Sequence, residues 1–194
     1  MDMLMTAGGS GPASGSCSIR LRRDVVAKLY TYVGPANIRA RAATSPPGQN
    51  ILSVHDLEGW IHQTGQRPNQ EGVIVVTFVV DEQGDLRVAD RGSEHVACSG
   101  GRPVLSAGEM FLTRTKTGWR VEEVSNQSTG FCPEPESWPA VASALDRVGI
   151  SHPGRFTLEI ILRRCLACGE RNIVKDGWFV CGLCGADLPA EWNF

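Results

Sequence analysis

Apolar residues recur every three or four positions in two stretches of this chain, as they do on one face of a helix. The first stretch begins with Ser53 and Asp56, a pair whose side chains bond to the backbone N–H groups of a first helical turn, and it ends at Gly65. The second stretch spans 137–148 and is followed by Gly149, a residue that favours a helix stop. We predict one helix in each stretch, with an apolar face that covers a core.

The middle of the chain changes to the pattern of strands. Residues 72–80 are nearly all apolar and many are β-branched, and after a polar turn at 81–85 apolar and polar residues alternate. These two segments predict a β-hairpin. Further strands are expected at 94–98, 109–115, 119–124 and 156–162. The short turns between them favour an antiparallel meander.

The N-terminal part has a different character. Residues 1–18 are rich in Gly and Ser and show no periodicity, so we expect a disordered tail. Segment 19–41 holds six basic residues and one acidic residue, Asp24. Asp24 predicts the start of a short helix that runs through Tyr30, and Pro35 suits the first turn of a second short helix.

Two C-x-x-C pairs, separated by twelve residues, stand near the C-terminus. Their cysteines are Cys165, Cys168, Cys181 and Cys184. Both thiolates of such a pair reach one ion, at about 2.3 Å for zinc, while backbone N–H groups of the tight turn bond to the sulfurs. Gly169 and Gly185 follow the pairs and relieve the strained position of each turn. The spacing predicts a zinc ribbon.

Four protein thiolates leave no coordination position for water, so we expect the site to be structural and not catalytic. Zinc suits a closed four-thiolate site, although iron of the rubredoxin kind uses the same ligands. The alternative is accidental spacing, with the four cysteines buried or joined as disulfides. With a metal bound, the ribbon would depend on it, because its own core is too small to stay folded alone.

These patterns together predict an α+β protein. A main domain over 19–162 would contain the antiparallel β-meander, the short N-terminal helices and one covering helix, and the C-terminal zinc ribbon would span 163–194. A chain of 194 residues can bury one ordinary core with a small satellite beside it.

The ribbon has a neutral, aromatic composition. Its four basic and four acidic residues cancel, whereas ribbons that bind nucleic acid usually have a basic face. Trp178, Phe179 and Trp192 are candidates for a protein-binding surface, and the alternative is that these rings pack the ribbon onto the main domain.

Two stretches, 94–109 and 125–138, are richer in Gly, Ser and Pro than ordinary turns. Residues 86–149 around them resemble the region shared by the plant IQ-motif calmodulin-binding proteins. The residues that match that family in order and spacing are His95, Gly101, Leu105, Ser106, Ala107, Gly108, Ser128, Phe131, Pro133, Glu136 and Trp138. The resemblance implies a shared β-rich domain and supplies no reaction. The chain has Gly130 where that family has a second histidine, and it has no IQ motif, so calmodulin binding is not implied.

A catalytic reading of the same stretches is open. His95, Cys98, Ser128 and Cys132 would offer a nucleophile and a base if the two motifs met in space. In a strand, however, His95 and Cys98 would point to opposite faces, and a cysteine of this kind is more often a small buried residue. This reading makes the chain a small enzyme or a toxin-like effector.

Global composition limits the remaining possibilities. The net charge of −2 gives no overall attraction to nucleic acid, so only the basic segment from Arg20 to Arg41 keeps nucleic-acid binding as a weaker alternative. The longest apolar run, 73–80, is far shorter than the roughly 20 residues of a membrane span. A secretory signal is not expected, and seven cysteines, four of them in metal-type pairs, suit a reducing cytoplasm. The leading hypothesis is a cytoplasmic zinc-binding adaptor that contacts another protein.

Overall fold

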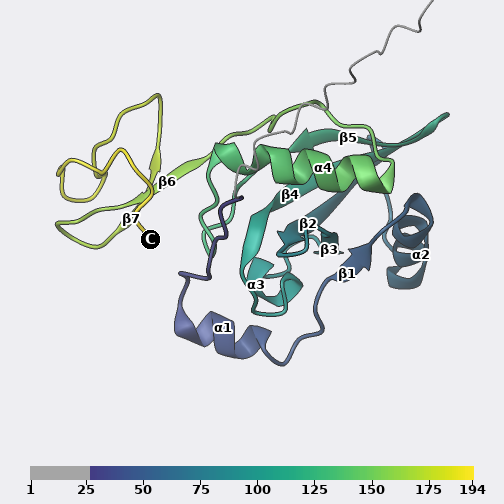
Figure 1. Ribbon diagram of the computed structural model, residues 1–194, viewed down its shortest axis with the longest axis horizontal. Helices are drawn as coiled ribbons and strands as arrows, with labels where there is room; N and C mark the ends of the chain where they lie inside the picture. Colours follow the sequence, from purple (N-terminus) through teal and green to yellow (C-terminus); the bar gives the residue numbers. More distant parts are fainter. Residues whose placement is uncertain (1–26) are drawn as a thin grey trace, which may run out of the picture.

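The computed structural model describes residues 27–194 (Figure 1). The predicted tail over 1–18 lies outside these residues, as does the beginning of the helix predicted from Asp24. The described end of that helix was predicted wrongly. Tyr30 is extended and forms a two-way bridge with Val104, with N···O distances of 2.8 and 3.0 Å. The backbone N–H and carbonyl of Tyr30 thus form their hydrogen bonds with the neighbouring strand and not within a helix.

One antiparallel sheet of five strands forms the centre of the main domain, which confirms the predicted α+β class. Its strands are β1 (Gln49–Ile51), β2 (Val73–Asp81), β3 (Leu86–Asp90), β4 (Val104–Thr115) and β5 (Gly118–Val124). The spatial order is β1-β3-β2-β4-β5, so β2 separates β3 from β4 and the strands do not follow one another as in a simple meander. The chain therefore crosses over β2 between two hairpins.

Two helices cover one face of the sheet and enclose the larger core. They are α2 (Val54–Thr64) and α4 (Trp138–Val148), which follows a short 3₁₀ turn, η1 (Pro135–Ser137). The predicted ends of both helices are confirmed. Ser53 Oγ accepts a hydrogen bond from the Asp56 N–H at 3.2 Å, while Gly65 and Gly149 take left-handed conformations with φ of 67° and 86°. Figure 1 shows α4 lying across the sheet.

The other face of the sheet is covered in part by α1 (Ala36–Ala42), by α3 (His95–Cys98) and by the extended segment at Tyr30. Helix α1 begins after Pro35 as predicted. Helix α3 replaces the strand predicted at 94–98, which was wrong. The segment that connects β3 to β4 contains this short helix, and Gly100 and Gly101 after it have positive φ and reverse the direction of the chain.

The ribbon is a separate two-stranded sheet that extends from one end of the main domain (Figure 1). Strands β6 (Ile161–Arg164) and β7 (Arg171–Val174) pair antiparallel. The final predicted strand thus begins later than expected. The Ile160 N–H donates to the Asn126 side-chain oxygen at 2.7 Å, so it is not available to pair with a strand. None of the helices in residues 27–194 has the length and apolar character to cross a bilayer.

Candidate metal centre

The two C-x-x-C pairs form matching tight turns. The Gly169 N–H donates to the Cys165 carbonyl and the Gly185 N–H donates to the Cys181 carbonyl, each at 2.9 Å. The two glycines have φ of 77° and 74°, which is the left-handed conformation expected after such a turn. The turns come together because β6 leads into the first pair and the chain after β7 returns to place the second beside it.

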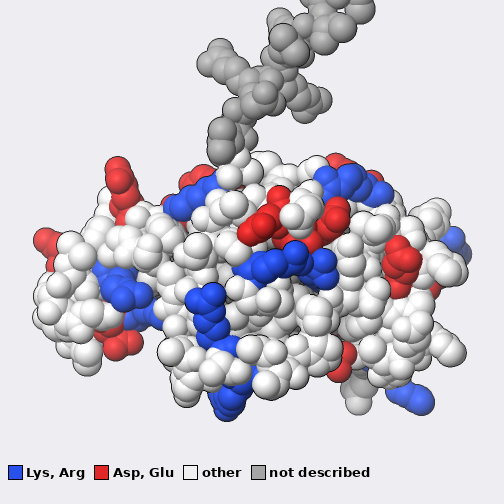
Figure 2. Space-filling view, turned by 60° about the horizontal axis from the view of Figure 1, so that its bottom comes forward, with Lys and Arg blue, Asp and Glu red and all other residues white. Residues whose placement is uncertain are grey.

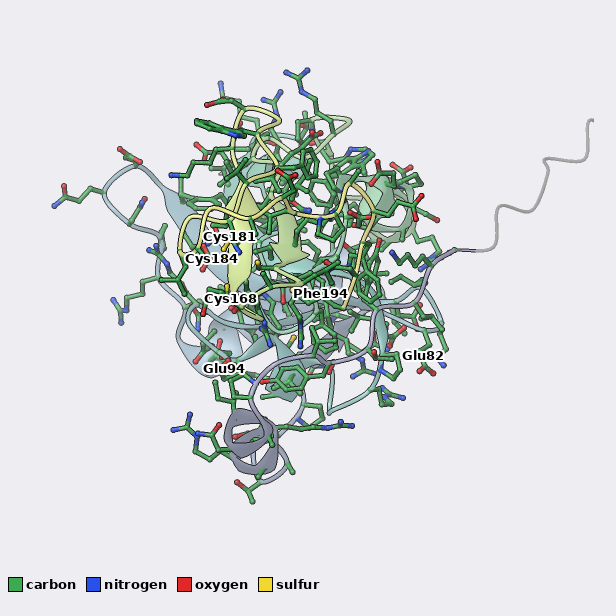
Figure 3. The ribbon with its side chains drawn as sticks, turned by 90° about the vertical axis from the view of Figure 1, so that its left-hand side faces the viewer. Glu82, Glu94, Cys168, Cys181, Cys184 and Phe194 are labelled. Atoms are coloured by element: carbon green, nitrogen blue, oxygen red, sulfur yellow. The ribbon has the colours of Figure 1, made fainter. Side chains whose placement is uncertain are left out.

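All four cysteine sulfurs lie within 4.8 Å of one another. The Cys165 and Cys184 sulfurs are 3.6 Å apart, and so are those of Cys168 and Cys181. A tetrahedral ion with bonds of about 2.3 Å requires sulfurs about 3.8 Å apart, so the spacing fits a four-coordinate metal. Figure 3 shows the three labelled cysteines of this group gathered in one place.

Backbone groups of the turns stabilise negative sulfur. Hydrogen bonds from the backbone N–H groups of Cys168 and Ala167 lower the pKa of Cys165, and those from Cys184 and Leu183 lower the pKa of Cys181 to about 6. Burial and hydrogen bonds to the neighbouring sulfurs raise the pKa of Cys168 to about 12, and the hydrogen bond to Cys165 raises that of Cys184, so without a metal the four sulfurs share their protons unequally. A thiolate, and not a thiol, is the metal ligand. The donor set therefore fits a metal ion, which would link the two turns by coordination to all four sulfurs.

Apolar packing inside the ribbon is sparse. Its buried apolar cluster contains Cys165, Val174, Cys181 and Leu188, with three partly buried neighbours. A core of this size contributes too little to offset the conformational entropy of the segment. The four sulfurs are therefore central to its fold.

The three candidate aromatic residues separate into different roles. Trp178 is 73% exposed. Phe179 is partly buried in the ribbon core, with the Arg163 guanidinium 5.9 Å from its ring centre. Trp192 packs edge-on against Tyr30 with ring centres 5.8 Å apart, so this ring joins the ribbon to the main domain. The packing alternative thus describes Trp192, while Trp178 is available at the surface.

The proposed catalytic candidates are held in packing roles. The His95 Nε2–H donates to the Gly108 carbonyl at 3.1 Å, and burial lowers the pKa of His95, so the imidazole is neutral at pH 7. Burial raises the pKa of Cys98 to about 12 and that of Cys132 to about 11. Ser128 is buried, and its Oγ accepts from the Phe131 N–H. Both thiols are therefore protonated at neutral pH and poorly suited to nucleophilic attack.

A cavity of about 600 Å³ opens between α1, α2 and α3. Of the four catalytic candidates, Cys98 alone lines it. The cavity also exposes the charged groups Arg41, Asp90 and Glu94 at its walls. His95, Ser128 and Cys132 are thus not brought together with Cys98 in this cavity.

Several residues of the two Gly- and Ser-rich stretches have packing roles. Ser106 Oγ lies 2.9 Å from Ser137 Oγ, and both side chains are buried. A methyl group built on Gly108 would come within 1.9 Å of the Ser125 carbonyl oxygen, so only glycine fits there. A Cβ atom at Gly130 would lie 2.7 Å from the Tyr32 ring, so a larger residue there would have to displace that ring.

Basic residues do not form a single surface in the view of Figure 2, where acidic and basic side chains are interspersed. Of the segment from Arg20 to Arg41, the residues up to 26 lie outside the described part of the chain. Arg39 and Arg41 are exposed on α1. The described part of the segment therefore offers three exposed basic residues, of which Arg39 and Arg41 lie on one short helix and Lys28 pairs with Glu134 at 3.8 Å.

In comparisons with known proteins, no protein-family model, curated sequence or solved structure matches this chain. The resemblance of 86–149 to the IQ-motif proteins accordingly stays a prediction.

Sequence reasoning missed the contacts of Arg163 and Asn193, which join the two ends of the ribbon and form its base. Arg163 and Asn193 lie on either side of the cysteine pairs and bond across to the opposite end of the segment. Neither belongs to a recognisable motif. Arg163 lies two positions before Cys165, but Asn193 lies nine positions after Cys184, so spacing gives no signal for the pair.

Proposed function

We propose that this chain is a cytoplasmic zinc-binding protein in which the metal is structural and the ribbon presents a surface for another protein. The observation that carries the proposal is the exposure of large apolar side chains on the ribbon. Leu166, Trp178 and Leu183 are 78%, 73% and 71% exposed, compared with 59% for Leu52, the most exposed large apolar residue of the main domain within 27–194. Exposed apolar groups of this size are typical of interaction sites.

The position of the two leucines strengthens this proposal. Leu166 lies between Cys165 and Cys168, and Leu183 lies between Cys181 and Cys184, so each occupies the tip of a metal-binding turn. A structural metal would hold both tips rigid, and a rigid surface loses less conformational entropy when a partner binds. The zero net charge of 163–194 favours an apolar contact with a protein over attraction to a polyanion.

Zinc is proposed over iron because a closed site of four thiolates needs no redox chemistry to be useful as a crosslink. The test is the metal content of the purified full chain by mass spectrometry, together with its absorption spectrum. One zinc ion per chain and a colourless protein are expected. A red protein with one iron ion per chain would identify the metal as iron and not zinc. A metal-free protein from zinc-supplemented cells would overturn the metal proposal.

The partner surface is tested by affinity purification from the native host with three variants. The double variant Leu166→Ala/Leu183→Ala keeps all metal ligands and should lose the partners that the wild type retains. Leu158→Ala, which changes a 52% exposed leucine of the main domain, is the matched control and should retain them. Cys165→Ser removes the metal site and should behave like the double variant. Equal recovery of every partner by the wild type and the double variant would contradict the proposal.

A further inference from the structure

A buried arginine connects three segments at the base of the ribbon. Arg163 is only 5% exposed and lies two residues before Cys165. Its Nε and one terminal nitrogen donate to the Ala190 carbonyl at 3.1 and 2.8 Å, and its other terminal nitrogen lies 2.7 Å from the Glu134 carboxylate of the main domain. Ala190 follows the second cysteine pair, so one guanidinium joins both ends of the ribbon to the main domain.

The next residue is fixed in the same way. The Arg164 N–H donates to the Asn193 side-chain oxygen at 2.9 Å, and the Asn193 amide nitrogen donates back to the Arg164 carbonyl at 2.7 Å. The Asn193 side chain therefore imitates a neighbouring strand beside β6. This pair of hydrogen bonds sets the distance between the two ends of the ribbon without using a cysteine.

Trp192 attaches the same end to the main domain. Its Nε1–H donates to the Cys132 carbonyl at 2.8 Å, and the Lys28 ammonium lies 4.0 Å from its ring centre. The edge-on contact with Tyr30 adds a buried aromatic neighbour. The Arg171 guanidinium on β7 donates in addition to the Thr129 and Val33 carbonyls. None of these contacts involves a sulfur atom.

We propose that Arg163 and Asn193 are positioning residues that pre-organise the four-cysteine site. They hold the two ends of the metal-binding segment together, and onto the main domain, before a metal binds. The entropic cost of bringing the two cysteine pairs together is then met in part by these contacts and not by the metal alone. The ribbon can therefore release and rebind its metal while both of its ends stay in place. This inference rests on the metal binding proposed above.

Metal affinity provides the first test, measured on the full chain by competition with a chelating dye. Asn193→Ala and Arg163→Met should each bind zinc about tenfold more weakly, the lower end of the range for residues that support metal ligands. Arg163→Lys keeps the charge and loses the two-pronged bond to Ala190, so its affinity should lie between Arg163→Met and the wild type. Arg114→Met is the control, because Arg114 pairs with Glu58 in the main domain and should leave the affinity unchanged.

Cobalt spectra separate this positioning role from a change of ligands. Each variant should show the same thiolate-to-cobalt charge-transfer bands as the wild type, since the four sulfurs are untouched. Wild-type affinity in both Asn193→Ala and Arg163→Met would overturn the inference. A wild-type chain that binds no metal would instead defeat the proposed function, so the two failures are distinguishable.

Hydrogen exchange gives a second readout on the wild type that does not depend on any variant folding. After metal removal, amide exchange should accelerate between Cys165 and Leu188. The Arg164 amide, which donates to Asn193, and the Tyr30 amide, which donates to Val104, should stay protected. Loss of Arg164 protection together with the metal would show that the metal, and not the base of the ribbon, holds the ends.

Discussion

The sulfur of Cys165 lies 3.6 Å from the sulfur of Cys184, although 19 positions separate the two residues along the chain. The contact crosses between the two C-x-x-C pairs, so the two pairs form one group of four sulfurs that could hold a single metal ion. A metal ion at this point links β6 to the segment that follows β7.

Replacing Cys165 with serine should abolish stoichiometric metal binding and unfold the segment between Cys165 and Leu188, because the small apolar core of the ribbon cannot hold this segment without the metal. The main domain should keep its own cooperative unfolding transition. Metal analysis and thermal unfolding followed by circular dichroism would check this. Cys98→Ala is the control for loss of a cysteine, and it should retain one metal ion per chain. Full metal content in the Cys165→Ser variant would contradict the site.

The buried thiols should be chemically inert in the folded protein. Burial raises the pKa of Cys98 to about 12 and of Cys132 to about 11, so almost no thiolate exists at pH 8. Alkylation of the metal-loaded chain with iodoacetamide, followed by peptide mass spectrometry, should modify neither residue until denaturant is added. Rapid alkylation of Cys132 under native conditions would revive the catalytic reading.

The same two pKa values predict a loss of stability in alkaline solution. Each folded pKa lies above the ordinary value of 9.0, so the folded state holds its protons more tightly than the unfolded state. The stabilisation is complete below pH 9 and falls as the pH rises toward 11 to 12, because only the unfolded thiols ionise in that window. Urea unfolding between pH 7 and 10.5 would measure the decline, and Cys98→Ala should make it shallower.

The buried pair of Ser106 and Ser137 should show energetic coupling. Removing one hydroxyl leaves the other buried without this partner, so Ser106→Ala should destabilise the fold by about 1–3 kcal/mol. The double variant Ser106→Ala/Ser137→Ala should cost less than the sum of the two single changes. Chemical denaturation of the four proteins completes the cycle, and strictly additive effects would rule out the hydrogen bond.

Glycine at position 108 is required by space and not by backbone angle. In Gly108→Ala the new methyl group would lie 1.9 Å from the Ser125 carbonyl oxygen, and we expect a loss of about 3 kcal/mol. Gly59→Ala is the matched control, since Gly59 lies inside α2 with open space around it. That change should stabilise the protein by about 0.5–1 kcal/mol through helix propensity. The two variants should therefore move the unfolding midpoint in opposite directions.

Local sequence signals were enough for the elements whose ends are marked by their own residues. Helix α2 is defined by the Ser53 cap and the Gly65 stop, and the hairpin of β2 and β3 by its apolar runs and polar turn. The cysteine turns belong to the same group, because spacing and the following glycine specify them within five residues. Each of these signals acts through neighbours in the chain.

The errors came from segments whose partners are distant in sequence. Tyr30 is extended because Val104 accepts and donates its backbone hydrogen bonds, and 94–98 is helical because the chain must cross β2 there. The roles of His95 and Cys98 followed from that change, since their environments are set by the sheet beneath them. No pattern within either segment carries this information.

The sequence by itself determined the two cysteine turns, the two main helices and the antiparallel hairpins, because these depend on residue spacing and on backbone preferences over a few positions. Tertiary structure alone decided that Arg163 and Asn193 close the base of the ribbon and that Trp192 packs while Trp178 is exposed. Those outcomes depend on contacts between Arg163 and Ala190, 27 positions apart, and on what the folded main domain leaves uncovered. Burial and long-range hydrogen bonding exist only once the chain has folded.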